Sequence, residues 1–332
     1  MIHHQEEGKA SVQAVRVKAF GGVDQLEMIE TPDPIPGRDE LLVQVKACGL
    51  NYADVVQREG LYPGGPKPPY FAGAEAAGIV TSHGPGVITP PLGSRVAVIA
   101  PNGMHAEHVV VKSASCLLLP ESMSFHEGAA FPIQYLTAYH ALTTVAHAVA
   151  GETVLIHAAA GGVGTAAVQI AKLLGLQVVA TASTAEKRSR VLALGADLAS
   201  DYDEFESACR RITSGCGPDI ILETVGGEVF RRSLALLPPL GRLVVIGVAG
   251  KQLQSLDTVK LLFRSQAVMG FHLSAVLSRS QLLANSLARL MAWFGEGRLK
   301  IQIGHTLPLA EIRRAHELLA SRKSYGKIVL IP

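Results

Sequence analysis

The sequence predicts an α/β protein with two domains, one a barrel-like β domain and the other a doubly wound parallel sheet. Three observations lead to this prediction. The chain has 332 residues, more than the ~250–300 at which a single hydrophobic core usually divides. Residues 13–120 hold short apolar segments separated by glycine and proline. From Thr153 onward, apolar strands alternate with segments of helical pattern, as in βαβ units.

The first half of the chain reads as short strands. The segments "AVRVKAF" and "ELLVQVKACG" alternate apolar and polar residues, as half-buried strands do. The segment "TPDPIPGRDE" between them predicts a loop, and "LYPGGPKPPYFAGAE" is too rich in proline and glycine for regular structure. The stretch "SRVAVIAPNGMHAEHVVVKSASCLLLP" predicts two or three more strands. Together these segments indicate the β domain.

The second half begins with the strand "TVLIHAA" and the helix "GGVGTAAVQIAKLLG". Such alternation favours a parallel sheet covered by helices on both faces. The next predicted strands are "QVVATAS", "DLASDY", "PDIILETVGG" and "GRLVVIGVAG", and the helices are "TAEKRSRVLALG", "DEFESACRRITSG" and "EVFRRSLALLP". Two amphipathic helices, "LSRSQLLANSLARLMAWFGEG" and "PLAEIRRAHELLASRK", and a closing strand, "GKIVLIP", end the chain. The strand "AVMGFHL" is expected at a sheet edge, which favours a homodimer because exposed edges invite pairing.

Composition narrows the functional class. A net charge of +2 and an aromatic content of 5% argue against nucleic-acid binding and against a basic membrane-binding patch. The four widely spaced cysteines favour a reduced, cytoplasmic protein. The opening "MIHHQEEGKA" has no apolar core, so it is not read as a secretory signal, and residues 1–12 are expected to be disordered. The uncharged runs 128–151 and 153–171 are interrupted by glycine, proline or histidine, so no stable membrane insertion is predicted.

The turn between the first strand and helix of the second half carries a dinucleotide-binding pattern. Ala159, Gly161 and Gly164 occupy the three positions of G-x-G-x-x-G, with Gly162 and Val163 between the last two. In this pattern Gly161 admits a pyrophosphate close to the backbone, and Gly164 lets the helix pack closely on the strand. The free N–H groups at the helix start then face the anion. A tight turn that binds no ligand is the alternative.

The residues after the second strand favour NADPH over NADH. NAD-binding folds carry an acid about 20 residues past the last glycine, where it binds the ribose. Here that position is Ser183, with Lys187 and Arg188 shortly after it and no acid in its place. A hydroxyl and a cation suit the 2′-phosphate of NADPH. The two basic residues alternatively form only a solvated helix face.

The motifs then resemble a known family. In order, "ACGLNYAD", "GLYP", "AGAEAAGIV", "HAAAGGVGTAAVQIAK", "LGAD", "GRLVVIG" and "GKIVLIP" are similar to the zeta-crystallin-like quinone oxidoreductase branch of the zinc-free medium-chain dehydrogenase/reductase superfamily. The resemblance covers residues 13–332. It implies a GroES-like β-barrel domain with a Rossmann domain inserted. The expected boundaries are 1–135 with 275–332 for the GroES-like catalytic domain, and 136–274 for the Rossmann NADPH-binding domain.

The same resemblance tests for zinc. The family's alcohol dehydrogenases carry a Cys-His pair in the first loop and a Gly-His-Glu motif after it. Here Asn51 and Tyr52 replace the pair, and Ala74 replaces the second histidine. A catalytic zinc needs about three N, S or O ligands from the protein, and the four-cysteine structural lobe is also absent from the sequence. No metal is therefore predicted.

Without a metal, reduction of conjugated acceptors is the expected chemistry. Alcohol oxidation needs an electrophile to stabilise an alkoxide, whereas a quinone or enone delocalises the charge that hydride brings and needs only a donor and a proton source. Asn51 is expected to hydrogen-bond the nicotinamide ribose or the substrate carbonyl. Tyr52 is a possible donor or a packing residue. Tyr62 matches a tyrosine implicated in protonation in some polyketide enoyl reductases; otherwise it is a wall of the pocket.

The resemblance implies further NADPH contacts. Thr137 is expected near the nicotinamide and Tyr202 beside the adenosine phosphate. Phe271 and His272 are expected at the carboxamide, and Arg322 at the 2′-phosphate. Helix packing for Thr137, a core position for Tyr202 and an exposed helix end for Arg322 are the alternatives.

The predicted function is NADPH-dependent hydride transfer to a quinone or other conjugated carbonyl without a metal. Two alternatives stay open. One is an enoyl reductase acting on an α,β-unsaturated thioester or ketone. The other is a protein that binds NADPH without turnover, because fold alone does not fix function.

Overall fold

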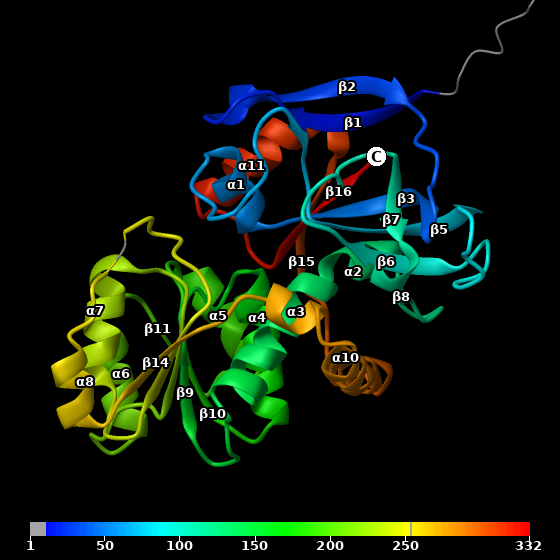
Figure 1. The fold of residues 1–332 in the computed structure, drawn as a ribbon. Coiled ribbons are helices and arrows are strands. Elements are labelled where there is room, and N and C mark those ends of the chain that lie inside the picture. The colour runs from blue at the N-terminus through cyan, green and yellow to red at the C-terminus, as the bar shows by residue number, and fades with distance from the viewer. Residues whose placement is uncertain (1–10, 253) are drawn as a thin grey trace, which may run out of the picture. The chain divides into compact units, whose positions relative to one another are not determined.

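The computed structural model describes residues 11–252 and 254–332. The chain divides into two compact units. We call the unit that ends at Pro132 and resumes at Ile303 the barrel unit, and the unit from Ile133 to Gln302 the Rossmann unit. Both are drawn as ribbons in Figure 1. Each unit is described by itself.

The barrel unit holds two sheets. A three-stranded sheet has the order β2-β1-β4, and a seven-stranded sheet has the order β15-β16-β3-β5-β6-β8 with β7 paired to β3. All pairs are antiparallel except β15 with β16. The strands are β1 (Ser11–Val17), β2 (Leu26–Pro32), β3 (Glu40–Leu50), β4 (Tyr70–Phe71), β5 (Glu75–His83), β6 (Arg95–Ile99), β7 (His108–Lys112), β8 (Cys116–Leu118), β15 (Ile303–Pro308) and β16 (Lys327–Ile331).

Helices of the barrel unit include α1 (Tyr52–Arg58), α2 (Phe125–Ala130) and α11 (Ile312–Ala320). Short 3₁₀ turns lie at Val23–Gln25, Ser113–Ser115 and Leu309–Glu311. The core collects the inward side chains of β1, β3, β5, β6 and β7 together with α11. The helix α1 was not expected, although Asp54 three residues after Asn51 is a capping arrangement that the sequence offers.

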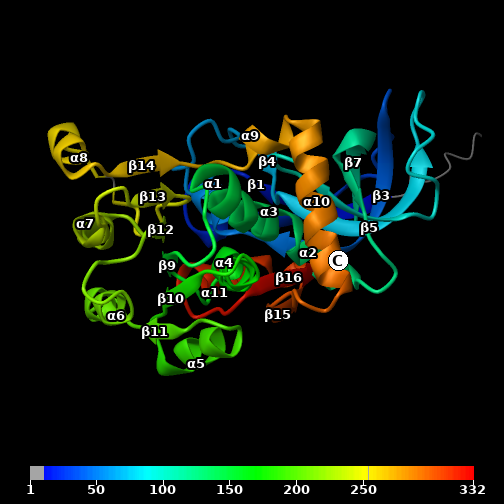
Figure 2. The same cartoon turned by 90° about the horizontal axis from the view of Figure 1, so that it is seen from below.

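The Rossmann unit is built on one parallel sheet of order β11-β10-β9-β12-β13-β14. The predicted doubly wound sheet is therefore confirmed: strands are added outward from β9 to β11 on one side and from β12 to β14 on the other. Helices α4 and α5 lie on one face, and α6 and α7 lie on the other (Figure 2). The strands are β9 (Thr153–Ile156), β10 (Gln177–Thr181), β11 (Leu198–Ser200), β12 (Ile220–Glu223), β13 (Arg242–Val245) and β14 (Ala267–Gly270).

The sequence explains why these elements form. The strands β9 and β12 are buried at every position, as strands covered on both faces must be. Thr184 caps α5 by accepting from the Lys187 N–H, and Asp257 caps α8. The helices are α3 (Pro132–His140, continued by a π turn at Ala141–Val145), α4 (Gly162–Leu173), α5 (Ala185–Ala193), α6 (Phe205–Ile212), α7 (Gly227–Leu236), α8 (Thr258–Arg264), α9 (Ser274–Leu277) and α10 (Ser280–Gly295).

Two boundaries differ from the expectations. Ser11 and Val12 were expected to be disordered, but they pair with Pro32 and Thr31 in the β1–β2 ladder. That expectation was wrong for these two residues, because Val12 is an inward-facing, buried strand residue; residues 1–10 lie outside the described part. The second domain boundary, expected near 275, corresponds to a division at 302/303. The segment after α10 belongs with the Rossmann unit because Gln169 and the Tyr135 hydroxyl both bond the backbone of Lys300.

Candidate active site

The turn between β9 and α4 presents unsatisfied backbone N–H groups. Gly161 precedes the helix in extended conformation, and no side chain caps it. The first intrahelical bond runs from Thr165 N to Gly161 O at 2.9 Å. The N–H groups of Gly162, Val163 and Gly164 precede that bond, so they belong to the set that a helix start leaves for a ligand. This geometry fits the phosphates of a dinucleotide.

Sterics explain two of the glycines. A Cβ at Gly164 would lie 2.4 Å from Ala158 O and 2.5 Å from Ala159 Cα, so only glycine allows the close approach of α4 to the strand end. A Cβ at Gly162 would lie 2.0 Å from the Gln134 amide nitrogen. The first turn of α3 therefore packs directly on the start of α4, which the sequence pattern did not indicate. At Gly161 a Cβ would meet only Ala158 O, at 3.3 Å.

Ser183 and Lys187 lie at the carboxyl end of β10. Ser183 is exposed and Lys187 is half-buried. Burial lowers the pKa of Lys187, and the neighbouring Glu186 carboxylate opposes this. Glu186 is itself paired with Arg190 one helical turn away, at 2.8 Å. This nearby carboxylate is thus held by a cation of its own helix.

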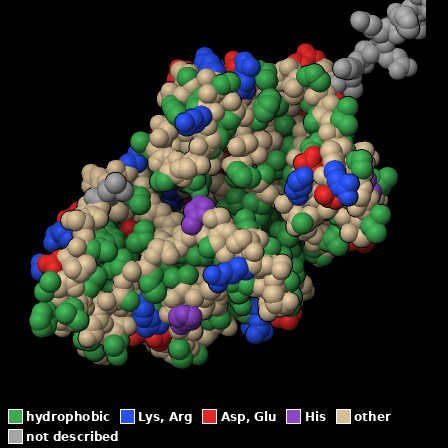
Figure 3. Space-filling model, viewed as in Figure 1, with side chains coloured by type: hydrophobic (Ala, Val, Ile, Leu, Met, Phe, Trp, Pro, Cys, Tyr) green, Lys and Arg blue, Asp and Glu red, His purple; other side chains and the backbone are tan. Residues whose placement is uncertain are grey.

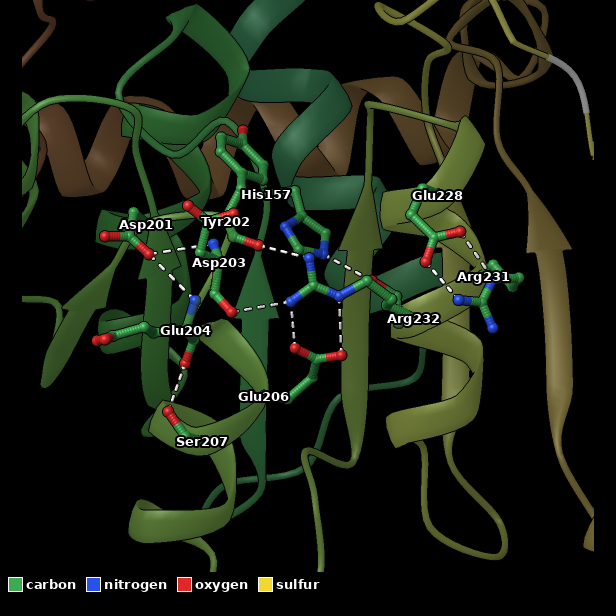
Figure 4. Close-up of polar contacts among 11 residues, drawn as sticks. His157, Asp201, Tyr202, Asp203, Glu204, Glu206, Ser207, Glu228, Arg231 and Arg232 are labelled. Atoms are coloured by element: carbon green, nitrogen blue, oxygen red, sulfur yellow. Dashed lines mark hydrogen bonds and ion pairs between the residues drawn. The ribbon is translucent and has the colours of Figure 1, made fainter.

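Tyr202 lies at the carboxyl end of the next strand, β11. Its hydroxyl accepts a hydrogen bond from the Ala158 N–H at 3.1 Å, which places it at the glycine turn. Its ring stacks on that of His157, with centroids 5.9 Å apart and planes inclined by 17° (Figure 4). The structure thus brings Tyr202, Ser183 and the glycine turn to the same edge of the sheet, which is where open α/β folds bind ligands.

Phe271 and His272 directly follow β14, and Thr137 lies on α3. Thr137 lies on α3, one turn after the Gln134 that contacts Gly162. Phe271 follows β14 and its ring centroid is 6.3 Å from that of His140, the last residue of α3. His272 is exposed and its Nδ1 lies 2.6 Å from the Ser274 hydroxyl.

A buried polar cluster lies in the barrel unit at the junction of β3, β5, β16 and α1. Lys327 and Glu75 are both fully buried and form an ion pair. The Lys327 ammonium also donates to Asn51 Oδ1 at 2.7 Å, and Asn51 Nδ2 donates to Glu75 Oε1 at 2.9 Å. Lysine can only donate and an ionised carboxylate can only accept. These two partners therefore fix the orientation of the Asn51 amide, with Oδ1 facing Lys327 and Nδ2 facing Glu75.

Asp54 supports this cluster from one turn into α1. Its Oδ2 accepts from the Asn51 backbone N–H at 2.8 Å. Its Oδ1 is buried and has no hydrogen-bond partner among the described residues. Burial raises the pKa of Asp54 to about 7, with Lys327 opposing the shift. Buried His105, which contacts Gly49 O through Nε2, has a pKa lowered to about 4 by burial.

The two tyrosines expected near the substrate are half-buried in the barrel unit. Tyr52 is the first residue of α1, directly after Asn51. Partial burial and the charge of Asp54 both raise the pKa of Tyr62. Its hydroxyl thus stays protonated at neutral pH.

Comparison with known proteins adds the family. Residues 37–121 match the alcohol dehydrogenase GroES-like domain, and residues 162–292 match a family described as zinc-binding dehydrogenase. The chain is 33% identical to human quinone oxidoreductase over 330 residues, covering 98% of this chain and 99% of that protein. The chain belongs to the quinone oxidoreductase branch of the medium-chain dehydrogenase/reductases.

Two further similarities extend over nearly the whole chain. The human synaptic vesicle membrane protein VAT-1 homolog is 34% identical over 333 residues, 94% of this chain and 84% of that protein. The structure of Escherichia coli quinone oxidoreductase complexed with NADPH matches with a TM-score of 0.92 and 31% identity, covering 97% of this chain and 100% of that one.

Whether this chain could bind a catalytic zinc depends mainly on the residue at position 51, which is an asparagine. Among residues 11–252 and 254–332, no group of three or more His, Cys, Asp or Glu could hold a metal ion. The position where the family's alcohol dehydrogenases carry a cysteine is here an amide whose oxygen accepts from the Lys327 ammonium. An ammonium at that point would repel a divalent cation. The donor set thus does not fit a catalytic zinc.

Sequence reasoning missed several polar residues of this oxidoreductase. Glu75 and Lys327 were part of the family motifs but were assigned no role, and neither were Asp54 and His157. A lysine that opens the apolar strand "KIVLI" was a usable signal, because a charge in a buried strand needs a partner. Arg322 follows α11, is exposed and has a φ of +60°, and its contact with the 2′-phosphate stays a prediction. No helix in the described part of the chain is long and apolar enough to cross a membrane.

Proposed function

We propose that this chain is an NADPH-dependent oxidoreductase that reduces a quinone or another conjugated carbonyl without a metal. The observation that carries the proposal is the edge of the Rossmann sheet. There the Tyr202 hydroxyl accepts from Ala158 in the turn before the open start of α4, and Ser183 and Lys187 follow the adjacent strand β10. The nearby Glu186 is paired with Arg190. The family and the relatives named above support it.

The Rossmann unit would hold NADPH, which supplies the hydride when bound. The N–H groups of Gly162, Val163 and Gly164 would bind the pyrophosphate. The Ser183 hydroxyl and the Lys187 ammonium would bind the 2′-phosphate. Both are donors, and phosphate oxygens are acceptors. NADH lacks this group, so we expect the site to favour NADPH.

At the other end of the site, three residues would orient the nicotinamide. The Thr137 hydroxyl can donate or accept, and backbone groups at Phe271 and His272 would meet the carboxamide. Phe271 N is already committed to Val245 O at 3.0 Å. The carbonyl of Phe271 and the N–H of His272 are therefore the groups we assign to this contact.

In the barrel unit we assign Asn51 as a donor. One of its Nδ2 hydrogens goes to Glu75, and its oxygen accepts from Lys327. An amide nitrogen has two hydrogens, so the second is the group that would bind the acceptor carbonyl or the nicotinamide ribose. The Lys327 ammonium that donates to Oδ1 draws electron density from the amide and strengthens that donor. We assign proton donation to Tyr62, with Tyr52 as the second candidate.

The proposal is tested by steady-state turnover with purified protein. We expect NADPH to be oxidised by a panel of quinones, and NADH to be a poorer donor at equal concentration. Faster turnover with crotonyl-type thioesters than with any quinone would instead favour an enoyl reductase. A stable NADPH complex that no acceptor oxidises would overturn the enzymatic proposal.

A matched pair of variants tests the 2′-phosphate site. We expect Lys187→Ala to weaken NADPH binding by about tenfold, near 1.4 kcal/mol, and to leave NADH binding within about twofold. Lys260→Ala, on the exposed face of α8, is the control for loss of a surface cation and should change neither affinity. Equal loss for both coenzymes in Lys187→Ala would remove Lys187 from the phosphate site.

We also propose a cytoplasmic homodimer. All four cysteines are free, which suits a reducing compartment. The strand β14 ends the sheet, and α8, which precedes it, exposes Val259, Leu262 and Phe263 by 59%, 73% and 83%. Hydrophobic side chains gather on the surface of this region (Figure 3). A second copy would cover both the apolar helix and the unpaired edge.

Sedimentation tests the assembly. We expect the wild type to be a dimer at micromolar concentration and Phe263→Asp to be largely a monomer. A wild-type monomer at every concentration would refute this part of the proposal.

A further inference from the structure

Arg232, on α7, fastens the segment that leads from β11 into α6. Its Nη1 donates to Tyr202 O at 2.7 Å, and its Nη2 donates to Asp203 O at 3.0 Å. Its Nε donates to Glu206 Oε1 at 2.9 Å, and Nη2 also pairs with the second Glu206 oxygen (Figure 4). The guanidinium carbon lies 4.6 Å from the centre of the Phe205 ring. A planar fork of five donors suits this set of partners.

The same helix fixes the Tyr202 ring through a second route. Ser233, the next residue of α7, lies 2.7 Å from His157 Nε2, and Thr181 Oγ1 lies 3.0 Å from His157 Nδ1. Burial lowers the pKa of His157 to about 3, so this ring is neutral and lies between two hydroxyls. Tyr202 stacks on it.

Tyr202 is therefore positioned at three points. Arg232 holds its carbonyl, His157 supports its ring, and the Ala158 N–H binds its hydroxyl. That last contact is at the glycine turn, and β11 pairs in parallel with β10, whose carboxyl end leads to Ser183. The phenol thus lies at the adenosine end of the coenzyme site. A phenol can both accept and donate, so the hydroxyl that accepts from Ala158 would donate its proton to a phosphate oxygen when the coenzyme binds.

We propose that Arg232 is a positioning residue for coenzyme selectivity. By fixing the Tyr202 carbonyl and anchoring Glu206, it holds the phenol where a 2′-phosphate would receive its hydrogen bond. Four of its five N–H donors are committed to Tyr202, Asp203 and Glu206, so we assign the guanidinium no direct contact with the coenzyme. This inference rests on the proposed function, in that the site is taken to bind NADPH.

The neighbouring Arg231 provides a matched control. It lies on the same turn of α7, is exposed, and pairs only locally with Glu228 among the contacts drawn in Figure 4. Arg232→Met and Arg231→Met remove the same charge and keep a similar stem. Only the first removes the hold on Tyr202.

The experiment measures dissociation constants of both coenzymes by titration calorimetry. We expect Arg232→Met to weaken NADPH about fivefold, which corresponds to about 1 kcal/mol, with NADH changed less than about twofold. Turnover at saturating NADPH should stay within about twofold of the wild type. Arg231→Met should change neither dissociation constant, and Arg232→Lys should fall between Arg232→Met and the wild type because it restores charge without the planar fork.

Tyr202→Phe tests whether the effect passes through the phenol. We expect it to lower the NADPH preference by itself, and the double variant Tyr202→Phe with Arg232→Met to be no worse than the more affected single variant. Additive losses would show that Arg232 acts by another route. If Arg232→Met does not fold, Glu206→Gln, which removes only the carboxylate anchor, is expected to lower the same NADPH-to-NADH ratio.

The outcomes separate this inference from the proposed function. A wild type that does not bind NADPH refutes the proposed function. A wild type that prefers NADPH, with an unchanged ratio in folded Arg232→Met or with equal loss for both coenzymes, refutes the positioning role alone.

Discussion

The buried pair of Lys327 and Glu75 gives the sharpest prediction for stability. Both side chains are fully buried and contact each other as well as the Asn51 amide. Lys327→Met removes the cation and leaves the Glu75 carboxylate without a counter-charge in the core. Breaking a buried pair in this way typically costs ~3–5 kcal/mol. We expect a loss of about that size in the free energy of unfolding, and a similar loss for Glu75→Gln.

The double variant separates charge from packing. With Lys327→Met and Glu75→Gln together, neither member of the pair is charged, and the glutamine amide can still accept from Asn51. Replacing a whole buried pair by neutral groups of similar size is often close to neutral. We therefore expect the double variant to be more stable than either single variant, with a coupling free energy of at least ~3 kcal/mol.

Urea unfolding followed by far-UV circular dichroism is the assay. The single tryptophan, Trp293, lies in the Rossmann unit, so its fluorescence reports a different part of the chain and serves as the comparison. Single variants that lose less than about 1 kcal/mol, or a double variant whose loss equals the sum of the singles, would refute the buried ion pair.

Three further predictions concern the turn, the buried acid and the metal. Gly164→Ala forces a Cβ to within 2.4 Å of Ala158 O, so we expect a loss of ~1–3 kcal/mol in urea unfolding together with weaker NADPH binding. Gly295→Ala, where a Cβ would meet no atom within 4 Å beyond its chain neighbours and its own helix backbone, is the control and should cost nothing. Equal stability of the two variants would contradict the packing argument. Burial raises the pKa of Asp54 from 3.8 to about 7, so the folded state holds this proton more tightly and the contribution of Asp54 to stability is lost as pH rises between these values. Asp54→Asn should therefore gain stability relative to the wild type by up to ~1.4 kcal/mol per pH unit over that range. A stability difference that does not vary with pH would show that Asp54 is not protonated there. Chelators should leave turnover unchanged, because the amide at position 51 accepts from an ammonium; stoichiometric zinc whose removal abolishes turnover would contradict this.

The alternating pattern of the second half was enough to predict the Rossmann sheet. The central strands β9 and β12 are buried at every position, and each helix predicted between the strands ends at a glycine or proline signal, so local sequence and burial agree. The edge position of β14 was also expected, and it is confirmed by the strand order. By contrast, α8 was missed. Its cap, Asp257, is a weak local signal. Its apolar residues Val259, Leu262 and Phe263 are spaced as on one helix face, but a helix of 7 residues is too short for that spacing to be distinctive.

Only those parts of the candidate site whose residues lie close together along the chain could be predicted from the sequence. The glycine turn and Ser183 lie within about one βαβ unit, so their spacing could be read along the chain. The cluster around Asn51 joins residues 51, 75 and 327 through a β-sheet, and no spacing rule connects such distant positions. The same holds for Arg232, whose partners lie on the preceding helix and loop. The contacts of these residues can be seen only in the folded structure, where the strands are paired.

The Lys327–Glu75 pair and the Arg232–Glu206 pair differ in solvent exposure, and this difference decides how their variants should behave. In the barrel unit Asn51, which we propose as a ligand-binding residue, is held by an ion pair with no exposure to solvent. In the Rossmann unit the Tyr202 carbonyl accepts from Arg232, which pairs with Glu206, and these two side chains are 22% and 32% exposed. When one partner of a buried pair is removed, the other charge is left in the core without water or a counter-charge, so the loss of stability is large. A solvated pair contributes only ~0–1 kcal/mol. Changes at Lys327 should therefore appear first as lost stability, and changes at Arg232 as lost coenzyme selectivity in a protein that still folds.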